Sequence, residues 1–170
     1  MVIKLASMRF LFISFFLLQL HTGVLGQTKL DKTLQRFNSA SVPYILPEDI
    51  IDSSSYILLD TRKKEEYHVS HLKDAIWVGD KAFDPSVVLE NIPDKEKPIV
   101  VYCSIGVRSE DIGEKLLALG YTNVQNLYGG IFEWKNKDKT IYNLKEQPTD
   151  SVHAFSKHWG KLLTKGIKVY

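Results

Sequence analysis

The residues best suited to chemistry lie in one short segment, in which a cysteine is followed five positions later by an arginine. Cys103 is the only cysteine in the 170-residue chain, and it follows Ile99–Tyr102, an apolar run typical of a buried strand. Between Cys103 and Arg108 lies a candidate loop of four residues: Ser104, Ile105, Gly106 and Val107. Because a thiolate is a strong nucleophile, this segment predicts a nucleophilic cysteine at the end of a strand.

A helix is expected to follow this loop at once. Residues 109–119 carry apolar side chains at helical spacing, and Gly120 is typical of the position after a helix. The N–H groups of the loop and the positive end of the helix dipole would lower the pKa of Cys103, and Arg108 would add a positive charge. The segment could therefore hold an anion or a persulfide on the sulfur. The same pattern also fits a buried structural cysteine.

The rest of the chain supplies elements that could position this segment. Apolar runs typical of strands lie at 56–59, 75–78 and 99–102, a last short strand is expected at 124–127, and helices are expected at 62–69, 85–91 and 109–119. Strands that alternate with helices favour a parallel sheet covered on both faces. In such sheets, sites lie at the carboxyl ends of strands, which is where Cys103 stands.

The N-terminal residues 1–26 have the organisation of a secretory signal peptide. Lys4 and Arg9 precede the apolar run 10–20, which is shorter than the ~20 residues that span a bilayer. Met8 is an alternative start, and an uncleaved anchor is the alternative to cleavage. We therefore expect an exported protein, periplasmic or secreted, with no membrane attachment once the signal is removed.

The charge is balanced outside this segment. The chain has 22 Lys and Arg residues against 20 Asp and Glu residues, and without Lys4 and Arg9 there remain 20 of each sign. This balance gives no indication of a nucleic-acid partner. A single cysteine allows no intramolecular disulfide, and an unpaired thiol in an exported protein favours a functional role for Cys103.

Beyond the signal peptide, the length corresponds to one domain with an extension at each end. We expect a lead-in at 27–46, a domain at 47–136 that opens with a helical turn at Pro47, and an extension at 137–170 that packs on the domain. The extension is expected to contain three elements: an extended or hairpin segment at 136–150, a short helix at Ser151–Leu163 and a closing strand at 166–170.

Two further clusters are interpreted as structural support for the site. Asp60, at a strand end, can pair with Arg62 or cap the local backbone, and His71 is expected to be a hydrogen-bonded turn residue. No second ligand has a suitable spacing from His71, so no metal site is predicted. Gly129 and Gly130 allow close approach of the backbone at the end of the last strand.

Together these residues resemble the rhodanese-like domain family. The resemblance rests on three motifs in the family's order: D-x-R-x-x-x-E-Y-x-x-x-H-L-x-x-A from Asp60, C-x-x-G-x-R-S from Cys103 and G-G-x-x-x-W from Gly129. It implies a three-layer α/β/α fold with a five-stranded parallel sheet. It also implies a sulfurtransferase, in which Cys103 carries sulfane sulfur as a persulfide. Ser104 stands where many members that use thiosulfate carry a basic residue.

The mechanism expected from this resemblance has two steps and needs no cofactor. Cys103 attacks the outer sulfur of a small-molecule donor, and a thiol or cyanide acceptor then removes that sulfur. The loop N–H groups of residues 104–108 would stabilise the negative charge, and Arg108 would orient an anionic donor. A protein acceptor is left open.

Two other functions are alternatives to sulfur transfer: a phosphatase-type or arsenate-reductase-type enzyme, and a non-catalytic module. Related phosphatase and arsenate-reductase domains have a loop one residue longer between the cysteine and the arginine, and Tyr102 stands where the phosphatases carry histidine. Rhodanese-like domains also serve as non-catalytic binding or regulatory modules, usually with loss of the cysteine, which this chain keeps.

Overall fold

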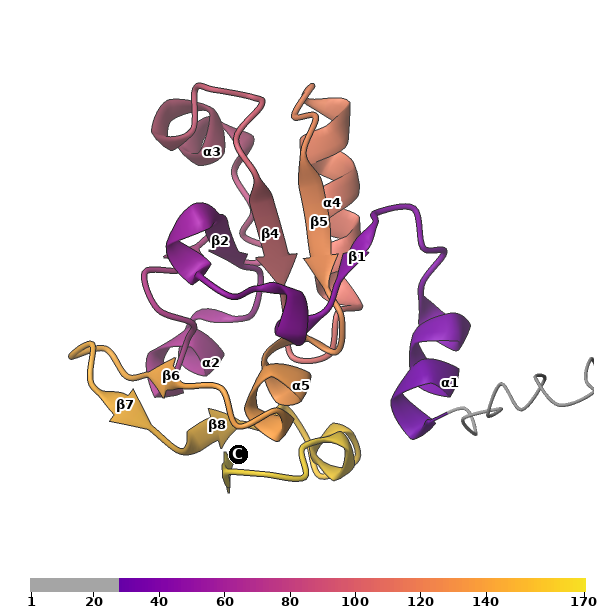
Figure 1. Cartoon of the computed structure of the whole chain (residues 1–170), viewed down its shortest axis with the longest axis vertical. Coiled ribbons are helices and arrows are strands. Elements are labelled where there is room, and N and C mark those ends of the chain that lie inside the picture. Colours follow the sequence, from indigo (N-terminus) through magenta and orange to yellow (C-terminus); the bar gives the residue numbers. More distant parts are fainter. Residues whose placement is uncertain (1–27) are drawn as a thin grey trace, which may run out of the picture.

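The computed structural model describes residues 28–170, and a five-stranded parallel sheet lies at its centre (Figure 1). In spatial order the strands are β1 (Tyr44–Ile45), β5 (Val124–Leu127), β4 (Ile99–Tyr102), β2 (Ile57–Asp60) and β3 (Ile76–Trp77). The predicted α/β fold with a parallel sheet is confirmed. Within this sheet, β1 is the strand that has no counterpart among the predicted strands.

The central strand β4 is buried on both faces. Successive side chains of a strand point to opposite sides, so β4 contributes to two separate core clusters. Val100 belongs to a cluster that includes Ile131, whereas Val101 belongs to a cluster that includes Ile112. This burial explains why the strand is a continuous apolar run rather than an alternating one.

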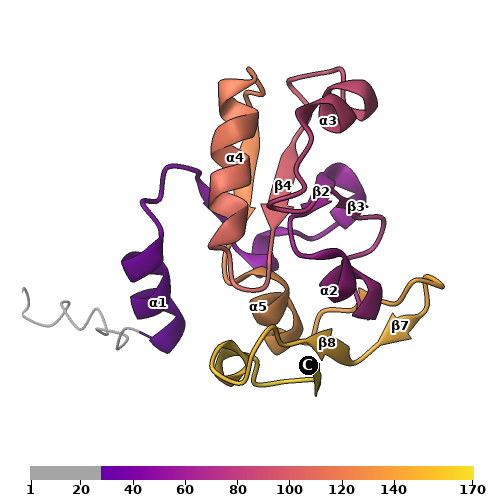
Figure 2. The ribbon, with the colours of Figure 1, turned by 180° about the vertical axis from the view of Figure 1, so that it is seen from behind.

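The helices of the domain are α2 (Lys64–Val69), α3 (Pro85–Asn91), α4 (Arg108–Ala118) and α5 (Gly130–Asn136). Val88 of α3 and Ile112 of α4 pack in the same core cluster, and Figure 2 shows α4 on the near side of the sheet, beside β4. Ile131 places α5 in the other cluster, below the carboxyl ends of β4 and β5 in Figure 1. Helix α3 has the bounds expected from its sequence, since Asp84 caps it and Pro85 occupies its first position.

The lead-in forms one helix, α1 (Lys29–Phe37), beside the sheet (Figure 1). The segment after α1 is tied to α4, because Glu110 accepts hydrogen bonds from the backbone N–H groups of Ser39 (3.2 Å) and Ser41 (3.0 Å). The helical turn expected at Pro47 is a single 3₁₀ turn, Pro47–Asp49.

The C-terminal extension differs from expectation in one element. The hairpin is present as β6 (Ile141–Tyr142) and β7 (Pro148–Thr149), and the closing strand is β9 (Ile167–Val169). The predicted helix at Ser151–Leu163 is wrong: this segment contains β8 (Ser151–His153), parallel to β9, and a 3₁₀ turn at Trp159–Leu162.

The burial pattern explains this difference. Val152 and Ala154, two positions apart, are both fully buried, which is the periodicity of a strand rather than of a helix. Phe155 then adopts a left-handed backbone conformation with φ 60°, which a helix cannot accommodate. Val152, Ala154 and Leu163 belong to the same core cluster as Val100.

The predicted signal peptide, residues 1–26, lies outside the described residues. From residue 28 onward, no helix has the length and apolar character needed to cross a membrane.

Candidate active site

Cys103 directly follows β4, and its sulfur is surrounded by the loop that leads into α4. The backbone N–H of Gly106 donates a hydrogen bond to Sγ over 3.1 Å. Burial raises the pKa of the Cys103 thiol, but the charge of Arg108 and the backbone N–H groups of Ser109, Ile105 and Gly106 outweigh it. The net effect is a pKa below the ordinary value of a thiol, which favours the thiolate.

Ser104 was expected to contribute its N–H group to this cradle, but it has a different role in the structure. Its hydroxyl donates to Oε1 of Glu66 over 2.9 Å, while the N–H groups that act on the sulfur come from Ile105, Gly106 and Ser109. Val107 lines the cavity beside Cys103 and begins the turn into α4.

Arg108 is held by an acid that sequence analysis assigned no role. Its two terminal nitrogens donate to the two carboxylate oxygens of Glu66, over 2.8 and 2.9 Å, and one of them also donates to the Ser104 hydroxyl over 3.0 Å. Asp80 lies 3.9 Å from the same guanidinium. Burial raises the pKa of Glu66, but the hydrogen bonds and charge of Arg108 hold it below its ordinary value. The positive charge of Arg108 is therefore balanced within the protein.

The loop is positioned by side chains on neighbouring elements. The carbonyl of Gly106 accepts hydrogen bonds from the side-chain amides of Asn126, on β5, and Asn38, after α1, both over 2.8 Å. The Ser109 hydroxyl donates a hydrogen bond to the side-chain oxygen, Oδ1, of Asn126 over 2.7 Å. Asn126 is fully buried on β5, and an amide inside a predicted strand is the signal that could have identified it, because a buried polar group needs hydrogen-bond partners.

Gly130 permits the close approach that supports the loop from below. It has φ 56°, and a Cβ at this position would lie 2.2 Å from the carbonyl oxygen of Cys103. That carbonyl accepts a hydrogen bond from the N–H of Ile131 over 3.0 Å. The adjacent Gly129 also has a positive φ, but a Cβ there would lie 2.4 Å from the Cβ of Glu133, so Gly129 serves the start of α5 and Gly130 the backbone beneath the cysteine.

The remaining predicted residues lie away from the sulfur. Asp60 and Arg62 form a fully buried ion pair with a shortest distance of 2.6 Å, and Arg62 also donates to the carbonyl of Ser70. The ring nitrogens of His71 lie 3.2 Å from the carbonyl of Tyr67 and 3.1 Å from Glu146. These contacts fix the segment that carries Glu66. Among residues 28–170, no group of three or more acidic, His or Cys side chains could hold a metal ion.

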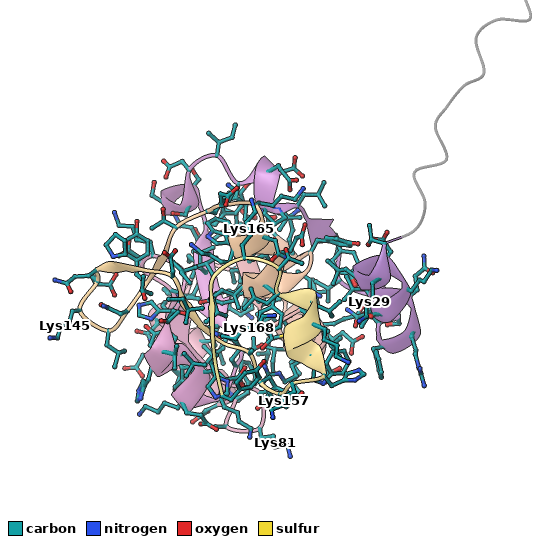
Figure 3. All side chains as sticks on the ribbon, turned by 90° about the horizontal axis from the view of Figure 1, so that it is seen from below. Lys29, Lys81, Lys145, Lys157, Lys165 and Lys168 are labelled. Atoms are coloured by element: carbon teal, nitrogen blue, oxygen red, sulfur yellow. The ribbon has the colours of Figure 1, made fainter. Side chains whose placement is uncertain are left out.

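A small cavity of about 170 Å³ lies beside the cysteine. Its floor is formed by the loop from Cys103 to Arg108, and its walls by three aromatic side chains: Phe37, Phe155 and Trp159. Cys103 contributes to the lining of this cavity, although only 1% of the residue is exposed to solvent. Figure 3 views this end of the molecule and shows the C-terminal segment, with Lys157, Lys165 and Lys168, crossing it.

Comparison with known proteins identifies the domain and its fold. The family model of the rhodanese-like domain matches residues 47–137. The tRNA uridine(34) hydroxylases of Yersinia pestis (strain Pestoides F) and Yersinia enterocolitica are each 36% identical to the chain over 110 residues. Each match covers 61% of this chain and 31% of the relative, so the chain spans about a third of the length of these relatives.

Two solved structures illustrate the shared fold. The thiosulfate sulfurtransferase of Pseudomonas aeruginosa superimposes with a TM-score of 0.53 at 24% identity, covering 72% of this chain and 23% of that one. A rhodanese-like domain from Anabaena superimposes with a TM-score of 0.54 at 18% identity, covering 62% of this chain and 82% of that one. At these identities the likeness concerns the arrangement of the elements.

Proposed function

The chain belongs to the rhodanese-like domain family, and on that premise we propose that it is a sulfurtransferase that carries sulfane sulfur as a persulfide on Cys103. The observation that supports this most strongly is the geometry of the loop, in which the backbone N–H of Gly106 donates to the sulfur of Cys103 over 3.1 Å, and the charge of Arg108 also favours the thiolate. A purely structural cysteine in an apolar core has no such groups directed at its sulfur, and burial raises its pKa.

In the first step, the thiolate of Cys103 attacks the outer sulfur of the donor. A new S–S bond forms on Cys103 while the bond between the outer sulfur and the rest of the donor breaks, and the donor leaves with that electron pair. The negative charge passes to the outer sulfur of the persulfide. The N–H of Gly106, 3.1 Å from Sγ, and those of Ile105 and Ser109 are placed to stabilise that charge.

In the second step, a thiol or cyanide acceptor attacks the outer sulfur of the persulfide. The new bond forms on the acceptor, the S–S bond of the persulfide breaks, and Cys103 returns to the thiolate. The two steps predict ping-pong kinetics without a cofactor. The tRNA reaction named for the Yersinia relatives is not part of this proposal, because the balanced charge of residues 27–170 gives no nucleic-acid footprint.

The experiment that tests the proposal is intact-mass measurement after exposure to a panel of sulfur donors. The protein should gain the mass of one sulfur atom, and a subsequent thiol or cyanide should remove it. Cys103→Ser should keep the fold and gain no sulfur. Normal sulfur transfer by that variant would falsify the assignment.

A non-catalytic binding module is the second candidate, and the burial of Cys103, which is 1% exposed, favours it. A binding module gains no sulfur from any donor, so the same measurement separates the two functions. We further propose that the protein is exported, on the basis of the basic and apolar residues of segment 1–26. Fractionation of cells that express the full chain tests this proposal.

A further inference from the structure

We propose that the cavity beside Cys103 selects a sulfur donor that carries a small apolar group next to its transferable sulfur, in preference to inorganic thiosulfate. This inference rests on the proposed sulfur transfer and names the donor class. It is carried by the aromatic side chains that line the cavity, by the balanced charge of Arg108, which also lines it, and by the volume of the cavity.

Three aromatic residues, here called the aromatic wall, line the cavity: Phe37, Phe155 and Trp159. The rings of Phe37 and Trp159 meet edge to face with centroids 5.6 Å apart. The guanidinium carbon of Arg108 lies 5.0 Å from the centroid of Phe155, so this ring covers one side of the arginine. An apolar group of a ligand gains free energy by leaving water for such a surface, whereas a small dianion loses its hydration there.

The electrostatic surroundings of Arg108 also disfavour a dianionic donor. Its guanidinium is engaged by both oxygens of Glu66 and lies 3.9 Å from Asp80, and the side chain of Arg108 is only 20% exposed. Two acids therefore surround the cation that would otherwise attract a doubly charged donor. The thiolate of Cys103 adds a further negative charge, which also repels a dianion.

The volume of the cavity limits the size of the apolar group. An apolar cavity of about 150 Å³ is sufficient to hold benzene, and this cavity measures about 170 Å³. A phenyl or short alkyl group therefore fits, whereas a large cofactor does not.

The aromatic wall is contributed by segments outside the family domain. Phe37 ends α1, and Phe155 and Trp159 belong to the C-terminal extension, whereas the family model matches residues 47–137. Phe155 is held in a left-handed conformation with φ 60°, and its N–H donates to the His153 ring over 3.1 Å. A bulky residue adopts this backbone conformation only where the surroundings impose it, which here places the ring over Arg108.

Three donors separate the effects of charge and apolar surface. Thiosulfate is a dianion, whereas methanethiosulfonate and benzenethiosulfonate are monoanions that differ only in the apolar group. With a thiosulfonate, the Cys103 thiolate attacks the outer sulfur, the new S–S bond forms, and a sulfinate leaves with the electron pair of the broken S–S bond. Charge and atoms balance without an oxidant or a reductant.

The rate of sulfur loading on Cys103 is followed by intact mass for each donor. Each rate is divided by the rate of the same donor with N-acetylcysteine at the same pH, which corrects for intrinsic reactivity. We expect benzenethiosulfonate to load about tenfold or more faster than methanethiosulfonate, the scale of an apolar ring leaving water, and thiosulfate to be slowest.

Two variants locate this preference. Phe155→Ala and Trp159→Ala should each bring the ratio of the two thiosulfonate rates toward one. Phe155 is 41% exposed, so its truncation leaves the core intact. The matched control is Leu144→Ala in the hairpin between β6 and β7, where the side chain is 55% exposed and the ratio should not change.

The outcomes are distinguishable. If all three donors load Cys103 at equal corrected rates, or if both wall variants keep the full preference, the donor inference is overturned and the sulfurtransferase proposal stands. If no donor loads Cys103, the proposed function itself fails, and the donor inference fails with it.

Discussion

Glu66 of α2 holds the guanidinium of Arg108 through two hydrogen bonds, 2.8 and 2.9 Å long, at the rim of the Cys103 loop. Because the carboxylate is buried, the pair joins α2 to the first turn of α4 and removes the free positive charge that the sequence motif suggests. The same contact therefore supports the loop and leaves Arg108 without a free positive charge for an anionic donor.

Replacement of this acid should restore attraction for an anionic donor. In Glu66→Gln the amide keeps the shape and can still accept from Arg108, but the opposing charge is lost. We expect the rate of loading from thiosulfate to rise about fivefold, equivalent to about 1 kcal/mol, relative to the rate from a thiosulfonate. The free energy of unfolding should fall by about 1–3 kcal/mol, because hydrogen bonds among buried groups are weakened. An unchanged donor ratio would show that Glu66 does not screen Arg108.

The thiol of Cys103 should ionise below the ordinary range. Because the chain has one cysteine, thiolate absorbance in the ultraviolet reports this group alone after subtraction of the Cys103→Ser spectrum. We expect the midpoint in the native protein to lie below the value of about 8.5 for a free thiol. Arg108→Gln should raise the midpoint, since the charge of Arg108 lowers the pKa of Cys103. Arg108→Lys keeps that charge and is the matched control.

The same shift should make stability depend on pH. The pKa of Cys103 is lower in the folded protein than in the unfolded chain, so the unfolded chain binds more protons between the two values. Stability should therefore rise with pH across this window. The contribution is fully present above the unfolded value, about 8.5, and is lost as the pH falls through the folded pKa. Urea titrations of the wild type and Cys103→Ser at several pH values measure it, and parallel pH profiles would contradict the expectation.

The buried pair of Asp60 and Arg62 should be costly to break. Arg62→Met leaves the carboxylate of Asp60 buried without its partner, and we expect a loss of about 3–5 kcal/mol in the free energy of unfolding. Lys97→Met, at an exposed position, also replaces a cationic side chain by methionine and should stay within about 0.5 kcal/mol of the wild type. Equal losses in the two variants would argue against a structural role for the pair.

Substitutions at Gly130 and Gly120 separate two effects of adding a Cβ: a clash with neighbouring backbone, and the strain of a positive φ. Both have a positive φ, but a Cβ at Gly130 would lie 2.2 Å from the carbonyl oxygen of Cys103, whereas at Gly120 the nearest atom is the flexible Lys95 side chain at 3.4 Å. Gly120→Ala should cost about 1–2 kcal/mol and leave sulfur loading intact. Gly130→Ala should cost more and should also raise the midpoint of Cys103 ionisation, because the loop must move. Thermal unfolding measures the loss of stability, and thiolate absorbance measures the midpoint of Cys103 ionisation.

Much of the domain could be predicted from the sequence because its signals are local. The apolar runs of β2 and β4, the Pro85 start of α3 and the cysteine at a strand end each depend on residues that are close in the chain. The helix predicted at Ser151–Leu163 failed because three apolar residues at helical spacing also fit a strand followed by a turn. The strand forms because β8 pairs with β9, and β9 lies beyond the segment whose apolar spacing suggested a helix.

The sequence by itself determined the position of the cysteine at a strand end, the loop that follows it and the alternation of strands and helices that indicates a parallel sheet, since each depends on residues close together in the chain. Only the tertiary structure decided what surrounds the sulfur. Glu66 is 42 residues from Arg108, and the aromatic wall joins Phe37 to Phe155 and Trp159 across the whole domain. Contacts of that kind depend on packing between distant segments, for which neither periodicity nor spacing along the chain carries a signal.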